Sequence, residues 1–246
     1  MSGAPGTPRM GPTVLVTFPR MTWIKICATT NLRDAQASVA AGANALGFTF
    51  APSARRMEVA TAGEIIAALP PEVEKIGVFV NETPERVAEI AARVGLTGVQ
   101  LHGDEPAAEL PKYRQMLGAR RLIKTLQARA LLTSGSDQQA YLDARANLDA
   151  ILLDSGAPEQ RGGTGVPFDW QSALPIVQEI KAVLPVIIAG GLTAANVGQA
   201  IRLFDPWGVD VVSGVERGPG NKDDVKLRSF VAAVRGRSPA LRDGSV

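Results

Sequence analysis

The sequence has few of the residues that build disulfides and metal centres. Its 246 residues include one cysteine and one histidine, and the formal net charge is only +2. One cysteine excludes an internal disulfide framework and a multi-cysteine metal site, and a lone thiol is typical of the reducing cytoplasm. The single histidine has no cysteine or carboxylate at metal-ligand spacing, which argues against zinc. We therefore expect a cytoplasmic protein without a metal.

Long apolar runs and concentrated charge are also missing. No apolar run reaches the roughly 18 residues that a membrane span needs. Basic residues do not gather in a stripe, so nothing points to nucleic acid. Apolar residues make up 46% of the chain and charged residues 20%, which is an ordinary globular balance. We therefore expect no nucleic-acid partner and no membrane partner.

The two ends of the chain differ from its middle. Residues 1–20 are rich in Gly, Pro and Thr, and they lack the charged start and apolar core of a signal peptide. Met21 begins the first stretch with a clear strand pattern. We expect a flexible N-terminal extension at 1–20, one functional domain at 21–237 and a flexible C-terminal tail at 238–246.

Within that domain, short apolar runs alternate with longer amphipathic ones. Runs rich in Val, Ile and Phe predict strands at 23–28, 45–50, 75–80, 98–103, 121–127, 150–154, 185–191 and 208–214. Helical periodicity covers 31–41, 83–94, 169–183, 194–204 and 223–234, and more weakly 133–147. Eight β–α alternations with short links predict a parallel (β/α)₈ TIM barrel. An open doubly wound sheet is the alternative, but its GxGxxG fingerprint does not follow the first strand.

Several predicted strands carry polar side chains on the face that should point to the barrel axis. Alternate residues of a strand point to opposite faces, and the branched apolar face should meet the helices. The other face then carries Lys25, Cys27, Gln100, His102, Asp154 and Asp210. Burying such groups without partners is costly. Because the first and last strands become neighbours when a barrel closes, we predict an internal ion pair between Lys25 and Asp210.

Three of these polar residues, Cys27, His102 and Asp154, lie near the carboxyl ends of their strands, where barrel active sites form. Cys27 is either a small buried apolar residue or a base, and a thiol of ordinary pKa near 8.5 needs only modest lowering to serve as one. Asp154 either caps the following segment or acts as an acid, which requires a raised pKa or a substrate that supplies the driving force. His102 is either a hydrogen-bonded wall residue or a substrate contact.

Three glycine-rich segments follow late strands. They are GGTG at 162–165, AGGL at 189–192 and SGVERGPG at 213–220. The last two follow the seventh and eighth predicted strands, where many barrels hold phosphate through backbone N–H groups and a helix N-terminus. Glycine allows the backbone to approach the phosphate oxygens. The pattern predicts a phosphorylated small-molecule substrate.

In combination, these blocks resemble the phosphoribosylanthranilate isomerase family from about residue 23 to residue 230. The matching blocks are KIC (25–27), GFTF (47–50), GVFVN (77–81), VQLHG (99–103), LLDS (152–155), GGTG and FDW (162–165, 168–170), AGGL and NV (189–192, 196–197), and VD, SGVE, PG and KD (209–210, 213–216, 219–220, 222–223). No single block is specific, but their order and combination are.

The resemblance implies an isomerase of the aldose–ketose type, active as a monomer or homodimer, without metal or cofactor. Its reaction in tryptophan biosynthesis is the Amadori rearrangement of N-(5′-phosphoribosyl)anthranilate to 1-(2-carboxyphenylamino)-1-deoxyribulose 5-phosphate. The same resemblance makes Cys27 the general base and Asp154 the general acid. Arg56 falls on the contact to the anthranilate carboxylate, with Arg55 as the adjacent alternative. The expected ligands of the phosphate and the rest of the substrate are Gly163, Gly190, Gly191, Ser213, Gly214 and His102.

Two positions depart from the family pattern. Ala28 follows Cys27 where the family usually has glycine, and Val212 replaces a serine. The methyl group of Ala28 is expected to narrow the site or alter the turn there. Two other functions remain open: another phosphate-binding barrel enzyme of tryptophan or histidine biosynthesis, and a non-catalytic barrel that binds phosphorylated metabolites or a partner protein.

Overall fold

A computed structural model describes residues 21–134, 136–155 and 169–236. Eight parallel strands form a closed barrel in chain order: β1 (Trp23–Ile26), β2 (Ala45–Thr49), β3 (Glu74–Phe79), β4 (Gly98–Leu101), β5 (Arg121–Gln127), β6 (Ala150–Asp154), β7 (Val186–Ile188) and β8 (Gly208–Val211). The predicted (β/α)₈ barrel is confirmed. The predicted extension at 1–20 and tail at 238–246 lie outside the described residues.

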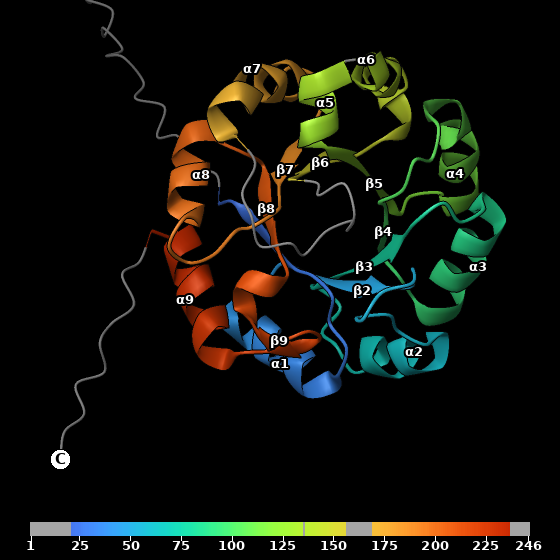
Figure 1. Ribbon diagram of the computed structural model, residues 1–246. Coiled ribbons are helices and arrows are strands. Elements are labelled where there is room, and N and C mark those ends of the chain that lie inside the picture. Colours follow the sequence, from blue (N-terminus) through green and yellow to red (C-terminus); the bar gives the residue numbers. More distant parts are fainter. Residues whose placement is uncertain (1–20, 135, 156–168, 237–246) are drawn as a thin grey trace, which may run out of the picture.

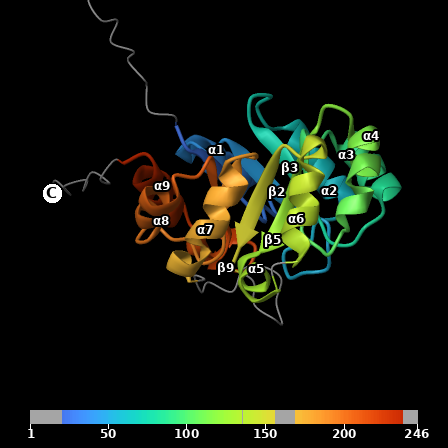
Figure 2. The same ribbon diagram turned by 90° about the horizontal axis from the view of Figure 1, so that it is seen from above.

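Helices surround the barrel (Figure 1), and the view turned by 90° shows α6 and α7 outside the strands (Figure 2). The helices are α1 (Leu32–Ala41), α2 (Val59–Ala67), α3 (Pro84–Val94), α4 (Leu110–Leu117), α5 (Ala128–Ser134), α6 (Ser136–Asp143), α7 (Trp170–Lys181), α8 (Val197–Phe204) and α9 (Asp224–Val234). The weak helical pattern at 133–147 corresponds to the end of α5, to α6 and to a 3₁₀ turn at Arg145–Asn147. Among the described residues, no helix is long and apolar enough to cross a membrane.

Side-chain caps set the starts of two helices that the sequence predicts. The Asn31 side chain accepts a hydrogen bond from the N–H of Asp34 at the start of α1. Thr83 does the same for Arg86 at the start of α3, where Pro84 occupies the first helical position. Capping satisfies a backbone donor that has no partner inside the helix, and proline there loses no helical hydrogen bond. These short signals therefore fix where each helix begins.

The alternation along the strands divides the apolar interior into two layers. One layer packs between strands and helices and includes Ile24, Ile26 and Val209. The other fills the inside of the barrel and includes Ile76 and Leu152. Because strand residues alternate between these layers, every second position is forced toward the axis. That constraint brings the polar residues of several strands together.

The barrel closes where β1 pairs with β8, and an ion pair lies at this junction. Lys25 and Asp210 are opposite each other in the strand register, and Lys25 Nζ lies 2.8 Å from Asp210 Oδ1. Lys25 is fully buried. Burial alone would lower the pKa of Lys25, but the charges of Asp210 and Cys27 and the hydrogen bonds to them together outweigh it and raise that pKa above its ordinary value. The predicted ion pair is confirmed, and Lys25 is a buried cation.

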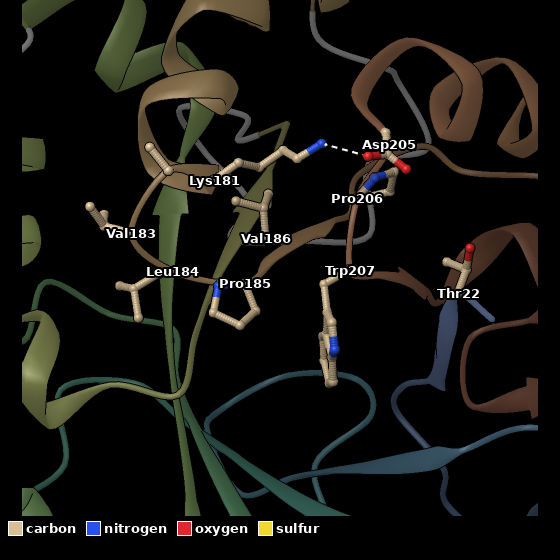
Figure 3. Close-up of a pocket in the computed structure, with 10 residues that line it drawn as sticks. Thr22, Lys181, Val183, Leu184, Pro185, Val186, Asp205, Pro206 and Trp207 are labelled. Carbon is tan, nitrogen blue, oxygen red and sulfur yellow. Dashed lines mark hydrogen bonds and ion pairs between the residues drawn. The ribbon is translucent and has the colours of Figure 1, made fainter. Parts of the chain in front are cut away.

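A cavity of about 470 Å³ lies at the amino end of the barrel, beside the starts of β1, β7 and β8 (Figure 3). Its charged lining residues, Lys181 and Asp205, form a pair with Nζ and Oδ2 3.0 Å apart. Of the predicted site residues that the structure describes, none lines this cavity. The candidate site therefore lies at the other end of the barrel.

We expect Asp210→Asn to destabilise the protein strongly. It would leave the buried charge of Lys25 unmatched, and breaking such a pair costs about 3–5 kcal/mol of unfolding free energy. Urea denaturation measures this loss. Glu89→Gln is the control, because the Arg86–Glu89 pair is exposed at both side chains (43% and 56%) and should contribute little to the unfolding free energy. Equal losses in the two variants would contradict a structural role for the buried pair.

Candidate active site

A cavity of about 850 Å³ opens at the carboxyl end of the barrel. It brings together six of the predicted site residues: Cys27, His102, Asp154, Gly190, Gly191 and Ser213. Gly163 lies outside the described residues. Arg56 and Gly214 are described but do not line the cavity. The carboxyl ends of β1, β4 and β6 thus converge as a parallel barrel requires.

Cys27 follows β1 and is held by its backbone. Its N–H donates to the carbonyl of Val211 at 2.9 Å, and its carbonyl accepts from Lys222 Nζ at 2.6 Å. Gly47 on β2 makes room for the sulfur, since a Cβ atom at position 47 would lie 2.5 Å from Cys27 Sγ. The glycine of the GFTF block therefore has a steric role beside the thiol, one that the sequence analysis did not assign.

The charge state of Cys27 is set by burial and by the charges around it. Burial raises the pKa of the Cys27 thiol above its ordinary value, the positive charge of Lys25 lowers it, and Asp210 raises it again. The balance is a raised pKa, so the residues around the thiol do not supply the modest lowering that a base requires. Cys27 is therefore a neutral thiol, and a further positive charge nearby is needed to favour the thiolate.

Asp154 is the last residue of β6, and its carboxylate lies next to the ring of His102 in the lining of the cavity. His102 Nε2 lies 3.6 Å from Asp154 Oδ2, which is an electrostatic contact beyond hydrogen-bond length. The Gln100 amide nitrogen lies 2.8 Å from His102 Nδ1 and also donates to Thr125 at 3.0 Å. With the amide in this orientation, Nδ1 accepts, and the neutral ring carries its proton on Nε2, toward Asp154. Burial lowers the pKa of His102 below its ordinary value, which keeps the ring neutral.

The glycine loops after β7 and β8 form another side of the cavity. Gly190 and Gly191 have φ values of +80° and +66°, a left-handed conformation that favours glycine. A side chain at Gly190 would also collide with Ser155. Gly214 differs, because a side chain there would collide with the carbonyl of Leu192, so this glycine packs the two loops against each other. Gly190 and Gly191 therefore line the cavity, whereas Gly214 allows the two loops to pack closely.

The arginine at the cavity is Arg55 rather than the predicted Arg56. Arg55 lines the cavity and binds Glu216, with Nη2 and Oε2 2.7 Å apart. Arg56 is exposed, and its backbone forms a parallel bridge with Thr49. Because neighbouring residues of an extended segment point to opposite sides, a shift of one residue turns the side chain away from the cavity. Of the two neighbouring arginines, Arg55 is therefore the one placed to meet a ligand in the cavity.

Two charged residues of the site were missed by the sequence analysis. Glu216 and Lys222 belong to the quoted SGVE and KD blocks, but no role was assigned to them. They lie on a short antiparallel hairpin formed by β9 (Glu216–Gly218) and β10 (Asn221–Lys222). Charged residues inside a glycine-rich loop were the available signal. Only the fold places them against Arg55 and Cys27.

The family of the chain can now be stated from comparison with known proteins. A family model described as N-(5'phosphoribosyl)anthranilate (PRA) isomerase matches residues 24–233. The chain belongs to this family.

Named relatives agree with this assignment over most of their length. The N-(5'-phosphoribosyl)anthranilate isomerase of Chlorobaculum tepidum is 42% identical over 216 residues, covering 87% of this chain and 96% of that protein. The one of Pseudomonas fluorescens strain SBW25 is 43% identical over 218 residues, covering 88% and 97%. The phosphoribosylanthranilate isomerase resemblance is therefore confirmed.

Solved structures of the family share the fold. The phosphoribosylanthranilate isomerase of Thermotoga maritima is similar with a TM-score of 0.76 and 38% identity, covering 88% of this chain and 100% of that chain. A second isomerase structure, in complex with reduced 1-(o-carboxyphenylamino)-1-deoxyribulose 5-phosphate, has a TM-score of 0.73 and 37% identity with the same coverage.

The two departures from the phosphoribosylanthranilate isomerase pattern both lie at the cavity. Ala28 and Val212 line it. Ala28 has a φ of +57°, a left-handed conformation that costs a residue with a side chain about 1–2 kcal/mol. Ala28 therefore adopts a backbone conformation that favours glycine, and it lines the cavity next to Cys27. At position 212 an apolar side chain replaces the serine hydroxyl.

We expect His102 to titrate below its ordinary pKa of about 6.5. Burial disfavours the charged ring in the folded state, whereas the unfolded chain takes up the proton freely. The contribution of His102 to the unfolding free energy is therefore present above pH of about 6.5 and decreases as the pH falls through that value. Because the chain has one histidine, ¹⁵N-detected NMR of the untagged protein reports this ring alone.

The same spectra identify the tautomer, which should carry its proton on Nε2. His102→Asn is the control for stability, because it removes this component of the pH dependence. A titration midpoint at or above the ordinary value, or a proton on Nδ1, would contradict the assignment.

Proposed function

We propose that this chain converts N-(5′-phosphoribosyl)anthranilate to 1-(2-carboxyphenylamino)-1-deoxyribulose 5-phosphate in tryptophan biosynthesis. The observation that carries the proposal is the meeting of Cys27 from β1 and Asp154 from β6 in one cavity beside two glycine loops. A family member 37% identical to the chain binds a reduced form of this product, which supports the same chemistry here.

Asp154 and Cys27 would divide the proton transfers. Asp154 donates a proton to the ribose ring oxygen as the bond from that oxygen to C1′ breaks, and the ring opens to a protonated imine. The Cys27 thiolate then removes the proton from C2′, which yields an enolamine that tautomerises to the ketone. The electron pair released at C2′ moves into the substrate's own iminium. The substrate therefore supplies the electron sink, and the protein supplies the acid and the base.

The raised pKa of Cys27 fits this order of steps. Before ring opening the buried thiol is neutral. Ring opening creates a positive charge on the substrate next to the sulfur, and a positive charge favours the thiolate. Lys25, buried below, acts in the same direction. The positively charged imine thus stabilises the Cys27 thiolate that removes its C2′ proton.

The remaining cavity residues would bind the two ends of the substrate. The loops with Gly190, Gly191 and Ser213 offer backbone N–H groups to the phosphate. Arg55 offers a planar guanidinium to the anthranilate carboxylate, a pairing that can use two parallel hydrogen bonds. His102, beside Asp154, forms the wall near the ring oxygen. Gly163, a further expected phosphate ligand, stays a prediction.

A different phosphate-binding barrel enzyme is less well supported. Indoleglycerol-phosphate synthase would need a lysine acid at the mouth, and Lys124 is the lysine on β5. Its Nζ lies 2.8 Å from Glu105 Oε2 and donates to the carbonyl of Gly103, and its side chain is 1% exposed. A lysine held in this way is a structural cation. A monomer or homodimer is the proposed assembly, and one similar structure is a monomer generated from the dimeric enzyme of Thermotoga maritima.

Cys27→Ser should lower kcat by about 10²–10⁴-fold, because a hydroxyl is a far weaker base than a thiolate. KM should change little, since the sulfur does not hold the phosphate or the carboxylate. The measurement is the loss of fluorescence of freshly made phosphoribosylanthranilate. Wild-type turnover in this variant would remove Cys27 from its role as base.

Asp154→Asn should lower kcat by a similar factor of about 10²–10⁴, because an amide cannot donate a carboxyl proton to the ring oxygen. Asp143→Asn is the matched control, since Asp143 lies on the exposed surface of α6. The same fluorescence assay applies to both. If the two variants turn over equally fast, Asp154 is not the acid.

A further inference from the structure

A buried charge pair lies behind the cavity wall, on the hairpin that follows β8. Glu216 on β9 is 5% exposed and Lys222 on β10 is fully buried. Lys222 Nζ lies 3.2 Å from Glu216 Oε1. Neither residue lines the cavity. Because burial of charge is costly, such a pair needs many polar partners to persist.

Lys222 holds the backbone of Cys27. Its ammonium donates to the Cys27 carbonyl at 2.6 Å, and its own N–H donates to the buried carboxylate of Asp34 at 2.7 Å. Ala28, which follows Cys27 in the chain, has a strained left-handed backbone. A strained turn persists only where its surroundings hold it. Lys222 therefore supplies a fixed contact at the peptide that joins Cys27 to Ala28.

Glu216 holds the guanidinium of Arg55 by one edge. Arg55 Nε lies 3.1 Å from both carboxylate oxygens, and Nη2 lies 2.7 Å from Oε2. Burial alone would raise the pKa of Glu216, but hydrogen bonds from Arg55 and the charge of Lys222 lower it. The carboxylate is therefore ionised and forms a two-point contact with the Nε side of the guanidinium. The opposite edge, between Nη1 and Nη2, has the geometry to bind a second carboxylate.

We propose that Glu216 and Lys222 are positioning residues of the active site, Glu216 orienting Arg55 toward the substrate carboxylate and Lys222 fixing the main chain of the base Cys27. This inference rests on the proposed function. Since Glu216 and Lys222 contact each other, one buried cluster joins the group that recognises the carboxylate to the group that moves the proton. The two residues nevertheless act on different parts of the site, so their loss should be seen in different kinetic constants.

Glu216→Gln should raise KM about tenfold or more with little change in kcat, because the neutral amide loses the negative charge and one of the two acceptor oxygens that hold Arg55. Lys222→Met should lower kcat by up to about 10²-fold, the effect of a misplaced catalytic group, with little change in KM. Lys226→Met is the matched control. Lys226 is exposed, and its ammonium donates to the main-chain carbonyl of Glu216 rather than to the side chain that holds Arg55, so both constants should stay at the wild-type level.

Two further readouts separate positioning from a merely structural role. The first is the affinity for reduced 1-(o-carboxyphenylamino)-1-deoxyribulose 5-phosphate and for the same compound without the ring carboxylate. Glu216→Gln should weaken binding of the first compound and leave the second unchanged. The second readout is the rate of iodoacetamide alkylation of Cys27, the one cysteine of the chain, which should change in Lys222→Met and stay at the wild-type rate in Glu216→Gln.

Each variant is first checked by urea unfolding, since both substitutions leave a buried charge unmatched. Should either fail to fold, the double variant Glu216→Gln/Lys222→Met removes both charges and carries the test, with KM raised and kcat lowered together. Unchanged constants, unchanged alkylation or equal weakening of the two ligands would overturn the inference. Wild-type protein that does not turn over phosphoribosylanthranilate would instead refute the proposed function, and the alkylation rates would still test Lys222.

Discussion

Closure of the barrel between β1 and β8 is the constraint on which the site depends. It makes Lys25 and Asp210 neighbours although 185 residues separate them in the chain. Their ion pair satisfies two buried charges that neither strand could bury alone. The carbonyl of Val211, one residue beyond Asp210, accepts from the N–H of Cys27. The pairing of β1 with β8 that brings the two charges together therefore also fixes the position of Cys27 at the carboxyl end of the barrel.

Two more buried lysines of the barrel and its loops are matched by carboxylates. Lys124 on β5 is paired with Glu105, and Lys222 with Glu216 on the hairpin. Such pairs contribute little net stability compared with apolar packing, but losing one partner is costly. They therefore act as geometric restraints that keep the loops at the carboxyl end in one arrangement. An active site whose groups come from separate strands needs such restraints, because small displacements lower the rate.

Charge also explains how one thiol is compatible with both burial and catalysis. Burial keeps Cys27 neutral in the free protein, while Lys25 lies on the side that favours the thiolate. The added positive charge of an opened substrate would complete the shift. The pKa of the buried thiol would therefore fall when the positively charged intermediate forms. The neutral ring of His102 beside Asp154 follows the same rule, since burial removes its charge.

The sequence by itself determined the barrel, the inward direction of Cys27 and Asp154, and the pairing of Lys25 with Asp210. These follow from strand alternation and from the order of the elements, which are local properties of the chain. Only the tertiary structure shows that Arg55 and not Arg56 lines the cavity, because a backbone bridge to β2 sets how this segment lies. It also decided the charge of Cys27 and the contacts of Glu216 and Lys222. Those depend on burial and on distances between segments far apart in the chain, which no local pattern encodes.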